Sequence, residues 1–188
     1  MTRWEADSRG RIERAALALY SERGFEQTTV VEIARRAGLT ERTFFRHFAD
    51  KREVLFGGAG TLQEFLVGAV AGAPESMAPL DAVAGALEAA AVLFQERRDY
   101  ARQRQMVIAA HAGLQERELI KLAALTLALA EALRGRGVSE PAASLAAEAG
   151  IVVFRSAFER WLSESNQQDW PHLVRESLDE LRAVTAGA

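Results

Sequence analysis

The sequence predicts an all-α protein with a small N-terminal helical head and a larger helical bundle. Ala and Leu dominate its 188 residues, 49% of which are hydrophobic, and runs of β-branched residues are scarce. This composition favours helix over strand. Apolar residues recur at helical spacing in most segments. Turn signals, drawn from 14 Gly and 4 Pro, divide these segments into about nine helices.

The first three predicted helices are close together. The first covers roughly residues 9–23 and has one apolar stripe. Thr29 and Glu32 have the spacing of a capping box that opens the second, which Gly38 stops after about two turns. Thr40 can cap the third. Three short helices with tight turns therefore form the predicted head, residues 1–56.

Six further helices are predicted after the first three, and the first of these six, the fourth helix of the chain, starts inside the head. Asp50 and Glu53 predict a cap for the fourth helix, and Pro74 and Pro79 mark the clearest break in the chain. Gly113 is expected to end the sixth helix, and Ser139 is expected to cap the eighth. The approximate bounds are 51–72, 79–95, 97–112, 115–134, 139–165 and, for the ninth, from residue 169 onward.

Charge is distributed unevenly along the chain. The net charge is −3, which by itself argues against binding to nucleic acid. Residues 1–56, however, contain 11 Lys and Arg against 9 Asp and Glu. Within residues 35–52 there are six basic residues against two acidic ones. The head thus has a local basic patch on an otherwise acidic protein.

Residues 28–56, TTVVEIARRAGLTERTFFRHFADKREVLF, have the spacing of a helix-turn-helix. Two short helices flank the turn at residues 37–40. Glycine at position 38 lets the chain reverse quickly, so that the second helix can enter a DNA major groove.

The segment GFEQTTVVEIARRAGLTERTFFRHFADKREVL resembles the N-terminal signature of the TetR family of transcriptional regulators. The match covers roughly residues 9–56 and includes paired or single residues at Gly24-Phe25, Thr28-Thr29, Ile33-Ala34, Ala37-Gly38, Thr43, His47-Phe48 and Lys51. Phe45 departs from the pattern, since the family usually has Tyr there. The resemblance implies DNA binding by the head and effector binding and dimerisation by residues 57–188.

Eight residues are predicted to contact operator DNA. Arg42 is the best candidate for bidentate contact with guanine, while Glu41 either accepts a bond from cytosine or only favours the helix dipole. Phe45 lacks the hydroxyl for a phosphate bond but can contact a thymine methyl. Phosphate contacts are expected from Thr29, which caps the second helix, and from Lys51 at the N-terminus of the fourth. The family resemblance implies a further backbone contact from His47. The set is Thr29, Glu41, Arg42, Thr43, Phe45, Arg46, His47 and Lys51.

The larger domain offers weaker candidates for an effector pocket. Tyr100, Arg104, Ile108 and His111 share one helical stripe, so their side chains should turn inward. Arg104 and His111 either form structural pairs or bind a polar or anionic effector. Thr126 is a further pocket candidate, although such residues usually bond back to their own helix.

Two features of the larger domain follow from family resemblance. The last two helices are similar to those that form a four-helix dimer interface in the TetR family, which predicts a homodimer. The segment RQRQMVIAAHAGLQERELIK faintly resembles regulators that sense fatty acyl-coenzyme A, and the same residues would suit other lipophilic acids.

Other classes of function find little support. The chain has no Cys and three His, and no grouping typical of catalysis stands out, so we expect no enzyme, no metal and no cofactor. We found no apolar stretch long enough for a membrane span and no signal peptide, and we expect a cytoplasmic protein. A ligand-released repressor is the leading interpretation, with an activator of the same fold as the alternative.

Overall fold

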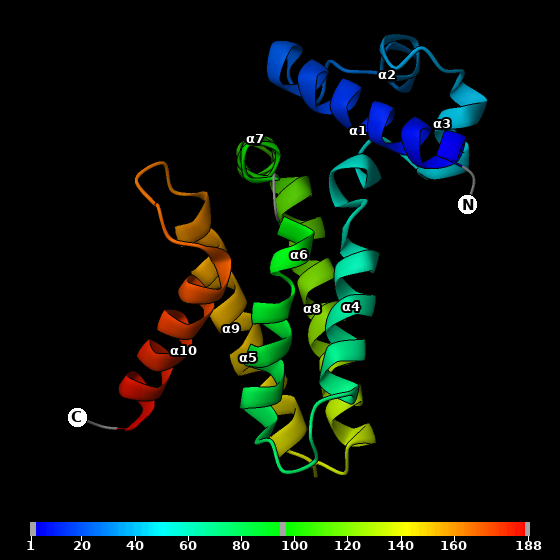
Figure 1. Cartoon of the computed structure of the whole chain (residues 1–188). Coiled ribbons are helices and arrows are strands. Elements are labelled where there is room, and N and C mark those ends of the chain that lie inside the picture. Colours follow the sequence, from blue (N-terminus) through cyan, green and yellow to red (C-terminus); the bar gives the residue numbers. More distant parts are fainter. Residues whose placement is uncertain (1–2, 95–96, 187–188) are drawn as a thin grey trace. The chain divides into compact units, whose positions relative to one another are not determined.

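The computed structural model describes residues 3–94 and 97–186, and within these ranges all regular structure is helical. The all-α prediction is therefore confirmed. In chain order the elements are α1 (Arg3–Arg23), α2 (Val30–Arg36), α3 (Glu41–His47), the 3-10 helix η1 (Glu53–Phe56), α4 (Ala59–Ala71), α5 (Pro79–Ala89), α6 (Ala91–Phe94), α7 (Arg98–Ala109), α8 (Ala112–Gly135), α9 (Ala142–Leu162) and α10 (Trp170–Ala186) (Figure 1).

Two predicted helices are each divided in the structure. The helix expected over 51–72 is η1 followed by α4, with Gly57 and Gly58 in a turn between them. Two consecutive glycines disfavour a continuous helix, because each costs about 1 kcal/mol relative to Ala. The helix expected over 79–95 is divided at Ala90 into α5 and the single turn α6. With these divisions, the nine predicted helices account for every helical element of the described residues.

Two predicted helix ends are wrong. Gly113 does not end a helix, because α8 begins at Ala112 and Gly113 lies in its first turn. Ser139 does not cap α9 with its side chain; Pro141 occupies the N-cap position without a side-chain bond, and only the Ser139 carbonyl accepts from the Ala143 N–H (3.0 Å). The turn between α7 and α8 lies about two residues before Gly113, and the N-cap of α9 lies two residues after Ser139.

Internal contacts divide the chain into two compact units. We call them the head unit, residues 1–59 and 102–118, and the bundle unit, residues 60–101 and 119–188. The first boundary lies three residues after the division predicted from sequence. Residues 102–118, from the end of α7 and the start of α8, pack with the head unit, although the sequence suggested no such grouping.

The head unit has a small apolar core. Ile12 and Leu19 of α1, Ile33 of α2 and Phe44 of α3 are buried together with the three apolar residues of η1. The Tyr20 hydroxyl donates to the Lys51 carbonyl at 2.6 Å, which fixes the segment after α3 against α1. The core thus holds α3 in place through one face and leaves its other face uncovered.

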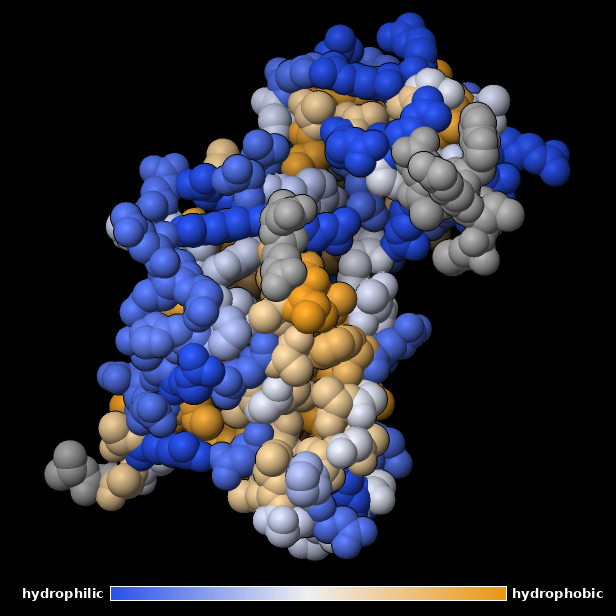
Figure 2. All heavy atoms as spheres, in the orientation of Figure 1, coloured by the Kyte–Doolittle hydropathy of each residue, from blue (hydrophilic) through white to orange (hydrophobic). Residues whose placement is uncertain are grey.

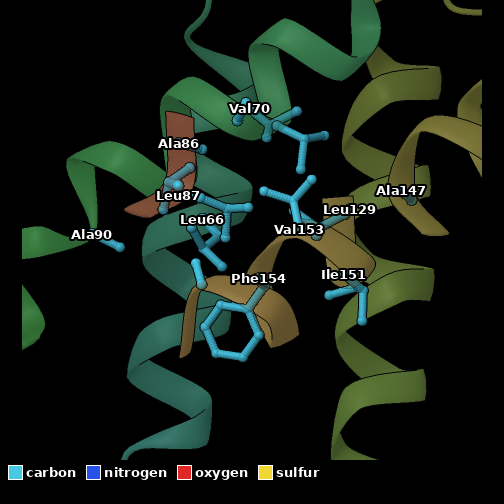
Figure 3. Packing of buried hydrophobic residues seen from close by; sticks show 14 of the residues in the cluster. Leu66, Val70, Ala86, Leu87, Ala90, Leu129, Ala147, Ile151, Val153 and Phe154 are labelled. Atoms are coloured by element: carbon cyan, nitrogen blue, oxygen red, sulfur yellow. The ribbon is translucent and has the colours of Figure 1, made fainter. Parts of the chain in front are cut away.

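The bundle unit is built around one larger hydrophobic cluster. Figure 3 shows side chains from four helices pointing into it: Leu66 and Val70 from α4, Leu87 from α5, Leu129 from α8 and Val153 from α9. The apolar stripe of α10 joins this core, and the Trp170 indole N–H donates to the Leu87 carbonyl at 2.6 Å. The last helix is therefore anchored to α5 as well as to α9.

By length and composition alone, the stretch Glu53–Ala71 is apolar enough to cross a membrane. In the structure it is not one helix, because the turn at Gly57 and Gly58 separates η1 from α4. The 13 residues of α4 would extend about 20 Å, well short of the roughly 30 Å of a bilayer core. Leu66 and Val70 are instead buried in the bundle unit.

Candidate nucleic-acid interface

The turn between α2 and α3 is a Schellman motif. Gly38 has φ +66°, the left-handed conformation that L side chains adopt only with strain. The Leu39 N–H donates to the Ala34 carbonyl (2.9 Å) and the Gly38 N–H to the Arg35 carbonyl (3.0 Å). Thr40 then caps α3, accepting from the Thr43 N–H at 3.2 Å. These bonds fix the direction in which α3 leaves the turn.

The recognition helix α3 has one buried face and one exposed face. Phe44 is 0% exposed and Phe48 is buried, as the sequence predicted. Phe45 is 54% exposed, and Glu41, Arg42 and Arg46 are also exposed. Arg42 and Arg46 make no hydrogen bond or ion pair with the residues that the structure describes. An apolar ring flanked by two uncommitted guanidinium groups is thus presented to solvent.

The polar residues at the edges of this face are partly engaged. Thr29 forms the predicted capping box: its hydroxyl donates to Glu32 Oε2 (2.9 Å) and accepts from the Glu32 N–H (3.3 Å). The hydroxyls of Thr43 and Thr40 lie 3.0 Å apart. The His47 ring is half-buried, with its centroid 6.4 Å from that of Phe48. Their phosphate or base contacts remain predictions.

Lys51 has a different environment from the one predicted. Its ammonium donates to the carbonyls of Phe25 (2.9 Å), Glu26 (3.2 Å) and Thr28 (3.0 Å), and it lies 4.5 Å from the centre of the Phe25 ring. A lysine has three N–H donors, so none is left for a phosphate here. The expected long helix does not begin at this residue either, and Lys51 instead fixes the loop before α2.

Three of the five effector candidates lie in the head unit, and two of them are engaged there. Arg104 donates to the Leu55 carbonyl, forms an ion pair with Glu118 (3.3 Å) and lies 5.1 Å from the centre of the Phe56 ring. His111 Nδ1 lies 2.9 Å from the Val107 carbonyl, and its ring packs edge-on against Phe25 at 5.3 Å. These contacts support structural pairing of Arg104 and His111, which was one of the two alternatives predicted for them.

The third, Ile108, is 0% exposed. Tyr100 and Thr126 belong to the bundle unit. The Arg97 guanidinium lies 5.9 Å from the centre of the Tyr100 ring, and the buried Thr126 hydroxyl donates to the Leu122 carbonyl at 3.1 Å. Thr126 thus bonds back to its own helix, as such residues usually do. The five candidates thus belong to two units, and their contacts with an effector remain predictions.

Sequence reasoning missed a second connection within the head unit. The Arg117 guanidinium near the start of α8 forms an ion pair with Glu53 at the start of η1. Together with the bond from Arg104 to the Leu55 carbonyl, it attaches residues 102–118 to η1 at two points. No periodicity links residues about 60 positions apart, so only the tertiary structure could reveal these pairs.

Two family models match the chain. Residues 12–56 match the model described as bacterial regulatory proteins, tetR family. Residues 77–186 match the model described as the MftR C-terminal domain. The first match covers the predicted helix-turn-helix, and the second covers most of the chain after it.

Individual relatives are similar over different parts of the chain. The transcriptional regulator TcmR of Streptomyces glaucescens is 39% identical over 82 residues, which are 44% of this chain and 36% of TcmR. The matched region thus spans only about a third of that relative. MftR of Mycobacterium tuberculosis is 27% identical over 158 residues, covering 82% of this chain and 80% of MftR.

Solved structures share the fold. SmeT, the repressor of the Stenotrophomonas maltophilia multidrug efflux pump SmeDEF, has been solved in complex with triclosan. That complex superposes with a TM-score of 0.65 at 20% identity, covering 94% of this chain and 90% of SmeT. At this identity the likeness concerns the fold alone.

Proposed function

Because this chain belongs to the TetR family of bacterial regulatory proteins, we propose that it is a ligand-responsive repressor that binds a palindromic operator as a homodimer. A small lipophilic effector, an acyl-coenzyme A or another organic anion, releases it from DNA. The observation that carries the proposal is the exposed face of α3. Arg42 and Arg46 make no bond with the described residues, and the Phe45 ring is 54% exposed, with an edge-on contact to Phe44.

The exposed face has the chemistry of major-groove readout. Arg42 lies in the first turn of α3, the part of a recognition helix that reaches base edges, and its planar fork suits guanine O6 and N7. Phe45 is placed to contact a thymine methyl, and Arg46 lies four residues after Arg42 on the same side. Glu41, Thr43 and His47 complete the contacts predicted for α3. Thr29 can reach phosphate only by giving up its bond to Glu32.

Dimerisation is proposed through α9 and α10, with the apolar contacts made by exposed residues of α9. The stripe of α10 that includes Trp170, Leu173 and Leu178 is buried inside the bundle unit, so it is not itself available to a partner. Up to Arg182 the outward side of α10 is mostly polar, and Figure 2 shows a mainly hydrophilic surface over this helix; Val184, near its end, is 74% exposed. Leu145 and Val152 of α9, 66% and 54% exposed and seven residues apart, provide the apolar contacts of the proposed interface.

Two observations support the proposed effector response. Residues 77–186 match the model of the MftR C-terminal domain, and SmeT, which shares the fold, has been solved with triclosan bound. Residues 102–118 of α7 and α8 are attached to η1 by Arg104 and Arg117. A ligand that favours a different position of α7 or α8 would act on the head unit through these two attachments and shift the dimer away from its DNA-competent state. The cytoplasm, where operators are found, is the proposed location.

Fluorescence anisotropy tests the DNA-binding part of this proposal. A labelled fragment from immediately upstream of the gene is titrated with protein beside a scrambled fragment, using wild type, Arg42→Ala and the control Arg134→Ala. Arg134 is an exposed residue of α8 in the bundle unit. We expect Arg42→Ala to weaken operator binding by about 1–3 kcal/mol per head and the control to bind as wild type does. Equal binding by all three proteins would contradict the assigned role of α3.

The sign of regulation and the dimer need separate measurements. Run-off transcription from the same fragment should fall as protein is added, whereas a rise would show an activator. Sedimentation velocity should give a dimer for wild type and a monomer for Val152→Glu, since a buried carboxylate without a partner is costly at an interface. A dimer that persists in Val152→Glu would place the interface elsewhere.

A further inference from the structure

A shallow groove of about 420 Å³ lies between α1 and the C-terminal end of α2 in the head unit. Four arginines line it, two from each side: Arg11, Arg14, Arg35 and Arg36. Small residues, among them the buried Ala15, form much of the remaining lining. The groove therefore combines a high density of guanidinium groups with little side-chain bulk.

The protein itself neutralises only part of this charge. Arg36 forms two hydrogen bonds to the Glu22 carboxylate, at 2.6 and 2.7 Å. Arg11 donates to the Gly38 carbonyl at 3.3 Å. Arg14 and Arg35 have no hydrogen bond or ion pair with any residue in the described ranges. The charge of Arg35 also acts on the Glu32 carboxylate, which is itself paired with Arg23. Four like charges with two carboxylates near them still favour the binding of an anion.

Gly38 contributes to this groove as well as to the turn. A Cβ atom on Gly38 would lie 2.6 Å from Arg11 Nη2, closer than such contacts allow. The glycine that the left-handed turn requires thus also leaves room for the Arg11 guanidinium beside the α2 C-terminus. The same glycine therefore both directs α3 and accepts the bond from Arg11.

We propose that this groove binds a phosphate oxyanion, supplied by the DNA backbone next to the bases that α3 reads. The inference rests on the proposed function. Guanidinium forks match phosphate oxygens in pairs, and the groove is open rather than enclosed, so a continuous strand can enter it. Gly38 is two residues before Thr40, the cap of α3, and is therefore within about 8 Å of it. A free phosphorylated molecule shares this chemistry.

The test compares two variants that each lose two positive charges. Arg14→Gln/Arg35→Gln empties the groove of its two uncommitted cations, whereas Lys121→Gln/Arg134→Gln removes the same charge from α8 in the bundle unit. Operator affinity is measured by anisotropy from 50 to 200 mM salt. In parallel, DNA-free protein is titrated calorimetrically with sodium pyrophosphate. Thermal unfolding confirms that both variants are folded.

The DNA source predicts that the slope of log K against log salt falls by about 0.9 per head in the groove variant and stays unchanged in the control. Preference for the operator over a scrambled fragment should persist, because α3 is intact.

If the slope is unchanged but pyrophosphate binds wild type and not the groove variant, the groove takes a free phosphate. The proposal is overturned if neither measurement separates the groove variant from the control. Loss of operator preference in wild type would instead contradict the proposed function, and the pyrophosphate titration would then decide the groove alone.

Discussion

The exposed face of α3 and the segment of residues 102–118 both belong to the head unit. Their arginines differ in whether other residues of the head unit bind them. On α3, Arg42 and Arg46 are exposed and uncommitted to any residue in the described ranges. In the α7–α8 segment, Arg104 and Arg117 are held by Leu55, Glu118 and Glu53. An arginine without a partner in the fold can bind another molecule. A paired arginine instead attaches one segment of the chain to another. The same residue type therefore serves contact in one region and attachment in the other.

The largest expected effect separates two adjacent phenylalanines. Phe44 is fully buried in the head unit and Phe45 is 54% exposed. Phe44→Ala should lower the free energy of unfolding by about 3–5 kcal/mol. Phe45→Ala loses an edge-on contact with the Phe44 ring and should lower it by about 1 kcal/mol at most. Urea unfolding measures both. Only Phe45→Ala should weaken operator binding while leaving the fold intact, and similar stability losses in the two variants would contradict the assigned faces.

Lys51→Met tests whether the Lys51 ammonium stabilises the fold or contacts a DNA phosphate. Removing an ammonium that three carbonyls accept from should cost about 2–3 kcal/mol of stability. The salt dependence of operator binding should stay as in wild type. A stable variant whose salt slope falls by about 0.9 per head would restore the predicted phosphate contact.

Arg104→Met keeps most of the apolar stem and removes the charge. We expect a loss of about 1–2 kcal/mol in urea unfolding, because the Leu55 carbonyl and Glu118 each lose a donor. Arg134→Met, which disrupts only exposed ion pairs with Glu131 and Glu140, serves as the control and should unfold almost as wild type does. Unchanged stability in Arg104→Met, with a lost effector response, would return Arg104 to the pocket candidates.

The smallest expected effect concerns the capping box of α2. Hydrogen bonds from the backbone and hydroxyl of Thr29, and then the charges of Arg23 and Arg35, hold the pKa of Glu32 below its ordinary value. Because the folded pKa is lowered, the carboxylate stabilises the fold above the unfolded pKa, and this contribution is lost as the pH falls through the folded pKa. The stability difference between wild type and Glu32→Gln should therefore shrink from pH 7 to pH 3. A difference that is constant over this range would contradict the capping role.

The head was largely predictable because its signals are local. The capping box of Thr29 and Glu32, the turn at Gly38 and the cap at Thr40 each involve residues within five positions of one another, and all three are present. Buried Phe44 and Phe48 follow from helical spacing. The environment of Lys51 was not predictable, since its three carbonyl partners come from a loop more than 20 residues earlier.

By itself, the sequence determined the helical class, the helix-turn-helix and the face of α3, because helix periodicity, capping and turn chemistry depend on neighbouring residues. Only the tertiary structure decided that residues 102–118 pack with the head unit, that the α10 stripe is buried within the chain, and that Arg11 and Arg14 face Arg35 across one groove. Those outcomes depend on contacts between distant segments, whose geometry is set by how whole helices pack.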